Sequence, residues 1–355
     1  MDKIKVLIID DSASMRSLIR ESLSASPKIE VIATAMDPIF AVQKILSLNP
    51  DVITLDIEMP RMDGLTFLSK LMISNPKPVI MVSSLTDHGT KETLKALELG
   101  AVDFLLKPSS DDPSAAGNFS RELIKKVIFA SQVKVNKTTP EKAKNITDMF
   151  ISDQLQDKKG QISKKDSEYV IAIGSSTGGT IVITDIMKNL SDNLPPILIV
   201  QHMPEGFTRP FAERLNSLSK IFVKEAEQED QVLRGCAYVA PAGRHLEIVK
   251  AMNGYRINLS DSDPVNRFKP SVDVLYKSVS ESAGEKSCAV ILTGMGNDGS
   301  KGMLELKNCG ACTIAQDEKS SVVFGMPREA IHIGAVSMVK NIEEITDYLN
   351  SLSSV

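Results

Sequence analysis

The chain has 355 residues, a length that predicts two domains, each able to bury a sizeable core. Its formal net charge of −4 disfavours nucleic acid and anionic membranes as partners. Four cysteines are too few for a disulfide framework, and neither a signal peptide nor a long apolar run is recognisable. We therefore expect a cytoplasmic protein with no membrane insertion and no nucleic-acid partner.

Strand and helix patterns alternate through residues 1–108. Apolar stretches separated by amphipathic segments predict five strands, near residues 4–10, 29–35, 51–56, 78–84 and 101–106. This alternation predicts a doubly wound α/β unit, in which helices cover both faces of a parallel sheet. A helical stretch at 120–133 completes the first domain, which we place at residues 1–130.

Acidic residues end two strands of this unit. Asp10 and Asp11 follow the first strand, and Asp56 follows the third. The carboxyl ends of parallel strands share one edge of a sheet, so the three carboxylates would converge there, as oxygen ligands do around Mg²⁺. The alternative is that these acids only cap or turn the chain. Ser83 and Lys107 end two further strands and favour the site, because a hydroxyl and an ammonium suit a phosphorylated carboxylate.

Together with the loop "MPRMDG" and Phe104, these residues resemble the receiver domain of two-component systems. The resemblance implies a (βα)5 fold in which Asp56 accepts a phosphoryl group from a histidine kinase. It also implies Mg²⁺ ligands at Asp10, Asp11, Asp56 and the backbone of Glu58, phosphate sensors at Ser83 and Lys107, and a switching aromatic at Phe104.

The composition shifts to Lys, Asp, Thr, Gln and Ser after the first domain, which predicts a polar flexible linker over residues 131–167, with a helical turn around 146–155. Continuous apolar runs then predict buried parallel strands at 168–174, 195–203 and 287–296. Between them, Asn253-Gly254 predicts a β-hairpin. We therefore expect a second, Rossmann-like doubly wound domain with a hairpin excursion over residues 168–355.

The segment "VIAIGSSTGG" at 170–179 predicts a strand, a tight turn and a helix. Its glycines could cradle a phosphate, or the turn could be a G-x-S-x-G nucleophile elbow centred on Ser176. The loop lacks both G-x-G-x-x-G and a lysine, which weakens the first interpretation. Ser175 places a second hydroxyl beside Ser176, so chemistry alone leaves the nucleophile ambiguous.

A serine nucleophile needs a base and an orienting acid at the same sheet edge. His202 follows the strand at 195–203, whereas His245 and His332 have no comparable placement. Asp298 follows the strand at 287–296. Asn297-Asp298-Gly299 taken alone is more typical of a turn, but three catalytic residue types at three strand ends favour a Ser176, His202, Asp298 set. Backbone N–H groups near Met295 and Thr177 are candidates for an oxyanion hole.

Four segments, "GSSTGGT", "VQHMPEGFT", "VAPAGRHLEI" and "LTGMGNDG", resemble signatures of the chemotaxis protein-glutamate methylesterase/glutaminase family, CheB. One departure is Ser175, where the family usually has alanine. The resemblance implies a phosphorylation-activated hydrolase that acts on glutamate γ-methyl esters, and on particular glutamine amides, of chemoreceptor cytoplasmic helices. It implies a chemotaxis histidine kinase as phosphodonor, Mg²⁺ in the receiver domain only, and no cofactor for ester hydrolysis. A phosphate-binding module and a DNA-binding regulator are the competing functions, the second disfavoured by the net charge.

Overall fold

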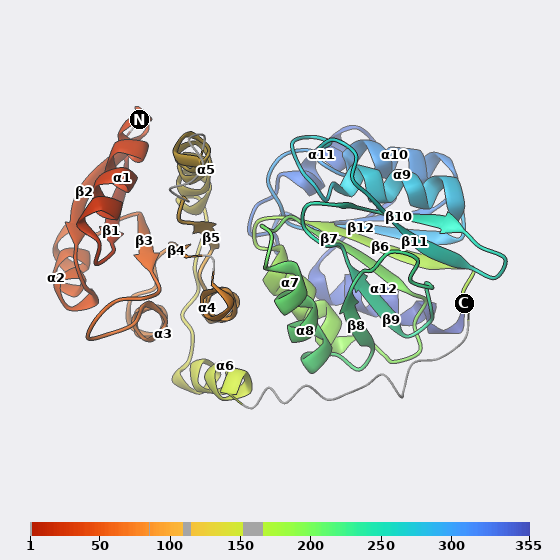
Figure 1. The fold of residues 1–355 in the computed structure, drawn as a ribbon, viewed down its shortest axis with the longest axis horizontal. Coiled ribbons are helices and arrows are strands. Elements are labelled where there is room, and N and C mark those ends of the chain that lie inside the picture. The colour runs from red at the N-terminus through yellow and green to blue at the C-terminus, as the bar shows by residue number, and fades with distance from the viewer. Residues whose placement is uncertain (1, 85, 109–114, 152–165) are drawn as a thin grey trace. The chain divides into compact units, whose positions relative to one another are not determined.

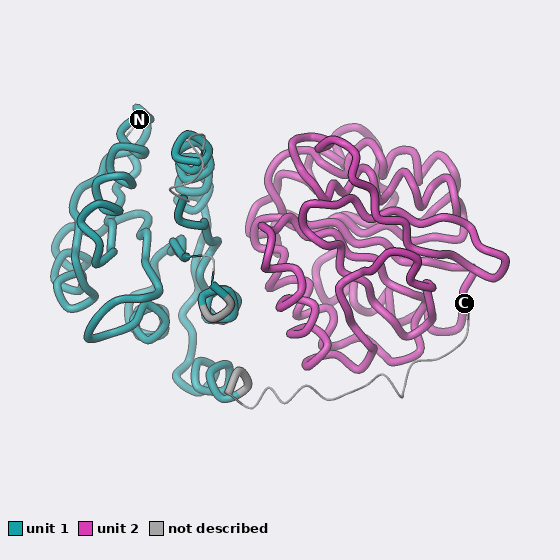
Figure 2. The backbone as a smooth tube through the Cα atoms, in the orientation of Figure 1, with its two compact units in different colours: residues 1–153 teal, residues 154–355 magenta. Residues whose placement is uncertain are grey.

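The computed structural model describes residues 2–84, 86–108, 115–151 and 166–355. The chain forms two compact units, residues 1–153 and 154–355, and each contains its own parallel sheet (Figures 1 and 2). Among the described residues, no helix combines the length and the apolar character that crossing a membrane requires. The α/β fold class predicted for both halves is confirmed.

The first unit is a five-stranded parallel sheet in the order β2-β1-β3-β4-β5. Its strands are β1 (Ile4–Ile9), β2 (Ile29–Ala35), β3 (Val52–Asp56), β4 (Val79–Ser83) and β5 (Asp103–Leu106). The helices between and after them are α1 (Ala13–Ser24), α2 (Pro38–Leu48), α3 (Gly64–Ser74), α4 (Asp87–Leu99) and α5 (Ala115–Ala130).

Side-chain caps explain where four of these helices begin. Ser12, Asp37, Asp63 and Thr86 each accept a hydrogen bond from a backbone N–H in the first turn of the helix that follows. The strands β1, β3 and β4 consist mainly of buried aliphatic residues, as expected of a parallel sheet whose two faces are covered by helices. The five strands lie where the apolar pattern predicts them.

A further helix, α6 (Pro140–Ile151), occupies part of the segment expected to be a polar linker. Ala143 and Ile146 on this helix are buried, and α6 packs against α4. The sequence indicated only a helical turn here, because two buried side chains are a weak periodic signal in a polar stretch. The rest of the expected linker, residues 152–165, lies outside the described residues.

The second unit is a seven-stranded parallel sheet in the order β14-β13-β12-β6-β7-β9-β8. Its strands are β6 (Val170–Ser175), β7 (Ile197–Gln201), β8 (Phe222–Glu225), β9 (Cys236–Val239), β12 (Ser287–Ile291), β13 (Cys312–Gln316) and β14 (Met338–Lys340). The helices are α7 (Gly179–Asn189), α8 (Thr208–Leu218), α9 (Val272–Ser282), α10 (Ser300–Asn308), α11 (Met326–His332) and α12 (Ile342–Ser351).

The predicted hairpin is present and is separate from this sheet. Strands β10 (His245–Lys250) and β11 (Tyr255–Ser260) pair antiparallel across Asn253-Gly254. The hairpin packs against α9 and contributes Leu246, Ile248 and Ile257 to the core.

The connections of the second sheet reverse direction beside β6. From β6 the chain proceeds to β7 on one side, and it later returns to β12 on the other side. In open α/β sheets such a reversal leaves a crevice at the carboxyl ends of the central strands. The turns after β6, β7 and β12 therefore define the place to look for a site.

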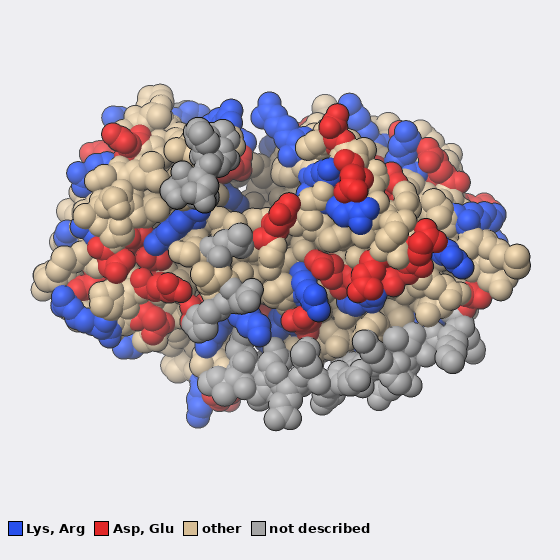
Figure 3. Space-filling model, in the orientation of Figure 1, with Lys and Arg blue, Asp and Glu red and all other residues tan. Residues whose placement is uncertain are grey.

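Charged side chains of both signs are mixed on the face of the molecule that Figure 3 draws. On the face drawn in Figure 3, Lys and Arg are interspersed with Asp and Glu, and the described residues form no broad basic patch there. This distribution agrees with the acidic net charge.

Candidate active site

The turn after β6 separates the roles of its two adjacent serines. Ser175 is the last residue of β6, is fully buried, and donates its hydroxyl hydrogen to Gln201 Oε1 at 2.6 Å. Ser176 is 9% exposed, and its N–H donates to the Thr293 carbonyl oxygen at 3.0 Å, which fixes the turn. Gly178 has a φ of +78°, and a Cβ there would lie 2.6 Å from Val322. The sharp turn therefore places Ser176, not Ser175, at the sheet edge.

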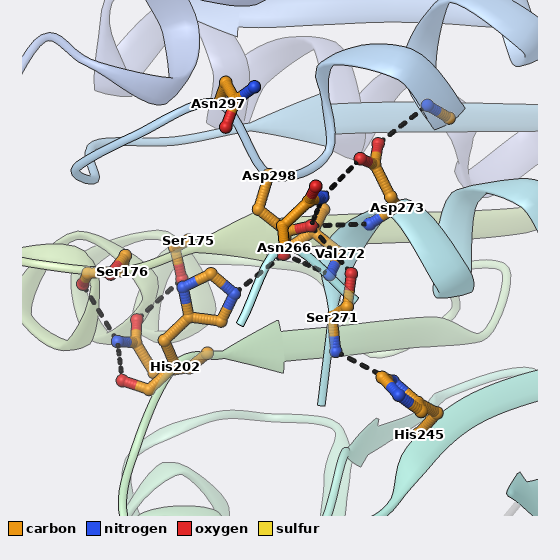
Figure 4. A network of polar contacts seen from close by, with 12 residues as sticks. Ser175, Ser176, His202, His245, Asn266, Ser271, Val272, Asp273, Asn297 and Asp298 are labelled. Atoms are coloured by element: carbon orange, nitrogen blue, oxygen red, sulfur yellow. Dashed lines mark hydrogen bonds and ion pairs between the residues drawn. The ribbon is translucent and has the colours of Figure 1, made fainter. Parts of the chain in front are cut away.

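His202 and Asp298 come together from the turns after β7 and β12. His202 Nε2 lies 2.8 Å from Asp298 Oδ2, and the imidazole is almost completely buried. Figure 4 shows the ring between Asp298 and the two serines. The other ring nitrogen, Nδ1, is buried and has no hydrogen-bond partner among the described residues. It is thus the nitrogen free to take a proton from a serine hydroxyl.

Asp298 is fully buried and is surrounded by donors. Oδ1 accepts from Ser271 Oγ at 2.7 Å and from Asn266 Nδ2 at 2.6 Å, while the Val272 N–H donates to Oδ2 at 2.7 Å. Val272 begins α9, so the positive end of the helix faces the carboxylate. Burial would raise the pKa of Asp298, but the hydrogen bonds from His202, Ser271 and Asn266 outweigh it and hold the pKa below the usual carboxyl value. The carboxylate remains charged inside the protein.

Two residues that the sequence analysis did not identify complete this arrangement. The Phe268 ring stacks on the His202 imidazole, with centroids 3.7 Å apart and planes 5° from parallel. Gln201 Nε2 donates to the carbonyl oxygens of Ser176 at 2.9 Å and of His202 at 3.1 Å. The Gln201 amide thereby links the ends of β6 and β7. Gln201 could have been found from the sequence, because it directly precedes His202 at the strand end. Nothing in the sequence links Phe268 to His202.

The oxyanion candidates lie beside the same turn. Within the described part of the chain, the half-buried Met295 has no hydrogen bond from its N–H. The preceding Gly294 lies so close to the turn after β6 that a Cβ on it would be 2.8 Å from Ser176 Cβ. Thr177 is half-buried, and its carbonyl oxygen accepts from Thr293 Oγ1 at 3.0 Å. Met295 and Thr177 stay predictions for the oxyanion hole.

The acidic site of the first unit forms at the carboxyl edge of β1 and β3. Oxygen atoms of Asp10, Asp11 and Asp56 lie within 4.8 Å of one another, the one such group of metal-ligating side chains among the described residues. Lys107 Nζ lies 2.7 Å from Asp56 Oδ2 and 3.1 Å from Asp10 Oδ2. Apart from this ion pair, the buried Asp10 Oδ2 has no hydrogen-bond partner among the described residues. An all-oxygen set containing such an atom fits Mg²⁺.

Charge and burial set the titration of this site. Burial, reinforced by the charge of Asp10, raises the pKa of Asp56 to about 6 despite the hydrogen bond from Lys107. Burial also raises the pKa of Asp10. For Lys107 burial acts the other way, but the carboxylates of Asp56 and Asp10 outweigh it and raise the lysine pKa. The site therefore contains more negative charge than its one lysine compensates.

The other residues predicted for the receiver site lie on β4, on β5 and after β3, and their roles stay predictions. Ser83 ends β4 and is buried, and the Lys107 N–H donates to its carbonyl oxygen at 2.8 Å. Phe104 is buried on β5, paired in register with Met81. Glu58 is exposed two positions after Asp56, and the Mg²⁺ ligand role of its backbone stays a prediction.

Two protein-family models match this chain, one for each unit. The family model for the CheB methylesterase matches residues 171–349, and the model for the response regulator receiver domain matches residues 6–114. The chain belongs to the CheB methylesterase family. The resemblances stated for both halves are confirmed.

Relatives in this family align over nearly the whole chain. A protein from Pectobacterium atrosepticum is 49% identical over 348 residues, covering 98% of this chain and 96% of the relative. One from Salmonella typhimurium is 48% identical over 349 residues, covering 98% and 97%. Both are named protein-glutamate methylesterase/protein-glutamine glutaminase. The crystal structure of the Thermotoga maritima CheB methylesterase catalytic domain, 42% identical, matches with a TM-score of 0.51 and covers 52% of this chain and 99% of that chain.

Proposed function

We propose that this CheB-family protein hydrolyses glutamate γ-methyl esters of chemoreceptors, and deamidates particular receptor glutamines, when Asp56 is phosphorylated. The observation that carries the catalytic part is the imidazole of His202. One of its nitrogens is bonded to the buried Asp298 carboxylate, and the other is unpartnered near Ser176 among the described residues. A serine hydrolase divides its imidazole nitrogens between an acid and a serine in this way, although here Nε2 rather than Nδ1 faces the acid.

The proposed reaction proceeds in two stages. Ser176 Oγ attacks the ester carbonyl carbon while His202 Nδ1 takes the hydroxyl proton, and the same nitrogen then protonates the departing methoxide to give methanol. A water molecule, deprotonated by His202, attacks the acyl-enzyme and releases the glutamate and Ser176. For an amide substrate, ammonia leaves in place of methanol. Asp298 supplies the negative charge that stabilises the imidazolium in both stages.

The proposed control resides in the first unit. The Asp56 carboxylate takes the phosphoryl group from a chemotaxis histidine kinase, and Lys107 stays paired with the oxygens at that position. Asp10, Asp11 and Asp56, with the backbone of Glu58, would hold Mg²⁺, which neutralises phosphoryl charge when bound. Ser83 and Phe104 would respond to the phosphate. The substrate helices belong to the cytoplasmic part of the receptors, so we place the enzyme in the cytoplasm.

One experiment tests catalysis and control together. The full-length protein is incubated with receptor-containing membranes whose methyl esters are labelled, with and without a small-molecule phosphodonor, and released methanol is counted. We expect release by the wild type, faster with the phosphodonor, and no stimulation of Asp56→Asn. Absence of methanol release from the wild type under both conditions would refute the proposed substrate, and stimulation of Asp56→Asn would refute the proposed control.

A further inference from the structure

The segment "VAPAGRHLEI" contributes none of the three proposed catalytic residues, yet it contains a fully buried histidine. His245 begins β10, and both of its ring nitrogens are engaged. The Ser271 N–H donates to Nδ1 at 3.1 Å, and Nε2 lies 3.1 Å from the Asp263 carbonyl oxygen. A backbone N–H can only donate and a carbonyl oxygen can only accept. The ring is therefore neutral, with its proton on Nε2.

Ser271, which donates to His245, also contacts Asp298. Ser271 is the N-cap residue of α9, and its hydroxyl donates to Asp298 Oδ1 at 2.7 Å instead of to the helix. The next peptide N–H, that of Val272, donates to Oδ2 at 2.7 Å. Figure 4 shows Ser271 between His245 and Asp298. One short stretch of backbone is thus held by the histidine from one side and binds both carboxylate oxygens on the other.

We propose that His245 is a positioning residue for the Asp298 carboxylate, an inference that rests on the proposed hydrolase function. By accepting the Ser271 N–H, the ring fixes the first turn of α9 and therefore the donors that hold Asp298 against His202. His245 touches neither substrate nor the reacting atoms, so it acts through Ser271 and Val272.

Gly243 and Arg244, directly before His245, form hydrogen bonds to the loop 261–271 that precedes α9. The Gly243 N–H donates to the Lys269 carbonyl oxygen at 3.1 Å, and Arg244 Nε lies 3.0 Å from Asp261 Oδ1. Three consecutive residues of the segment therefore each bond to the loop 261–271. This is the loop that carries Phe268, stacked on His202.

The hairpin continues this support along α9. The Ile248 N–H donates to Ser278 Oγ at 3.1 Å, and Ser282 Oγ donates to the Ile248 carbonyl oxygen at 3.0 Å. β10 is thus hydrogen-bonded to α9 beyond its first turn. The hairpin, which is not part of the seven-stranded sheet, acts as a support for the helix end that faces Asp298.

Two substitutions separate positioning from simple packing. His245→Phe fills the ring volume but removes the acceptor for the Ser271 N–H. His245→Asn leaves a cavity but keeps an acceptor oxygen near the place of Nδ1. We expect His245→Phe to lower kcat about tenfold to a hundredfold with KM unchanged, because small misplacements of catalytic groups have effects of that order. We expect His245→Asn to stay within about threefold of the wild type, although the cavity makes it the less stable variant.

The assay is methanol release by the full-length protein from labelled receptor membranes, combined with thermal unfolding. Ser278→Ala is the matched control, since it removes a hairpin contact of α9 away from Asp298 and should lower stability without lowering kcat. The inference would be overturned if the less stable variant were also the slower one, with His245→Asn slower than His245→Phe. Full activity of His245→Phe would also overturn it. If His245→Phe does not fold, Asn is compared with Ala, and equal rates overturn the inference. An inactive wild type would instead contradict the proposed function.

Discussion

Replacing Asp298 by asparagine tests whether the buried carboxylate acts through its charge. His202 Nε2 and the Val272 N–H donate to Oδ2, and Ser271 and Asn266 donate to Oδ1. The asparagine NH₂ group must occupy one of these two positions. At the Oδ1 position it meets the Ser271 hydroxyl, which can rotate to accept, so we expect this orientation. The amide oxygen then keeps its hydrogen bond to His202.

Loss of charge, more than loss of a hydrogen bond, therefore determines the expected effect. His202 Nε2 and Asp298 Oδ2 are 2.8 Å apart. At an effective dielectric constant near 20, unit charges at about that separation attract by roughly 6 kcal/mol, and the attraction exists only after the imidazole has taken a proton. The dipole of the asparagine amide would retain part of this attraction. We therefore expect transition-state stabilisation to fall by about 4 kcal/mol and kcat to be about a thousandfold lower. KM should change little, because the imidazolium is absent from the ground state.

The assay compares initial rates of methanol release by phosphorylated wild type and Asp298→Asn, with unfolding followed at several pH values. The pKa of Asp298 is lowered in the folded protein, so its ionised form stabilises the fold above the usual carboxyl pKa. That contribution is lost as the pH falls through the lowered value. The stability difference between wild type and variant should therefore shrink below about pH 4. A variant within tenfold of wild-type kcat at neutral pH would refute the assignment of an electrostatic role to Asp298.

Three further predictions follow from the same geometry. Ser176→Ala should abolish methanol release while Ser175→Ala retains most of it, since the Ser175 hydroxyl faces Gln201; comparable losses in both variants would leave no basis for choosing the nucleophile. Phe268→Ala should lower kcat about threefold to tenfold by removing the ring stacked on His202, and Phe268→Tyr should restore it; an unchanged kcat in Phe268→Ala contradicts this. Chelation of divalent cations should block stimulation by a phosphodonor but leave basal release unchanged, and loss of both would place a metal in the esterase reaction.

The strand ends were the part of this site that the sequence could predict. A buried parallel strand is a continuous apolar run, so its last residue is visible in the sequence, and Asp10, Asp56, Ser176 and His202 all follow such runs. Because parallel strands share their carboxyl edge, the meeting of these residues needs no knowledge of loop structure. The short strands β8 and β9, with four residues each, carry too weak a pattern to be recognised in this way.

The loop 261–271 was the part that the sequence could not predict. It carries Asn266, Phe268 and Ser271 to Asp298 and His202, but its course is set by hydrogen bonds to residues 243–245, more than fifteen positions earlier in the chain. No periodicity marks such a loop, and polar residues in it are also typical of turns. His245 was set aside for the same reason, since its position at the start of a hairpin strand gives no indication that it bonds to Ser271.

Each of the two sites has one buried carboxylate at its centre, Asp298 or Asp56. The two carboxylates differ in their surroundings, and the difference suits their proposed roles. Asp298 accepts hydrogen bonds from His202, Ser271 and other donors, which lower its pKa and keep the carboxylate ionised at neutral pH. Asp56 accepts from the Ile57 N–H and Lys107, lies beside a second buried carboxylate, and has its pKa raised to about 6. A carboxylate that is ionised at neutral pH can orient a base, whereas a carboxylate among other negative charges is stabilised when a cation binds beside it. In the proposed function, the same carboxylate chemistry therefore orients a base in one unit and accepts a phosphoryl group in the other.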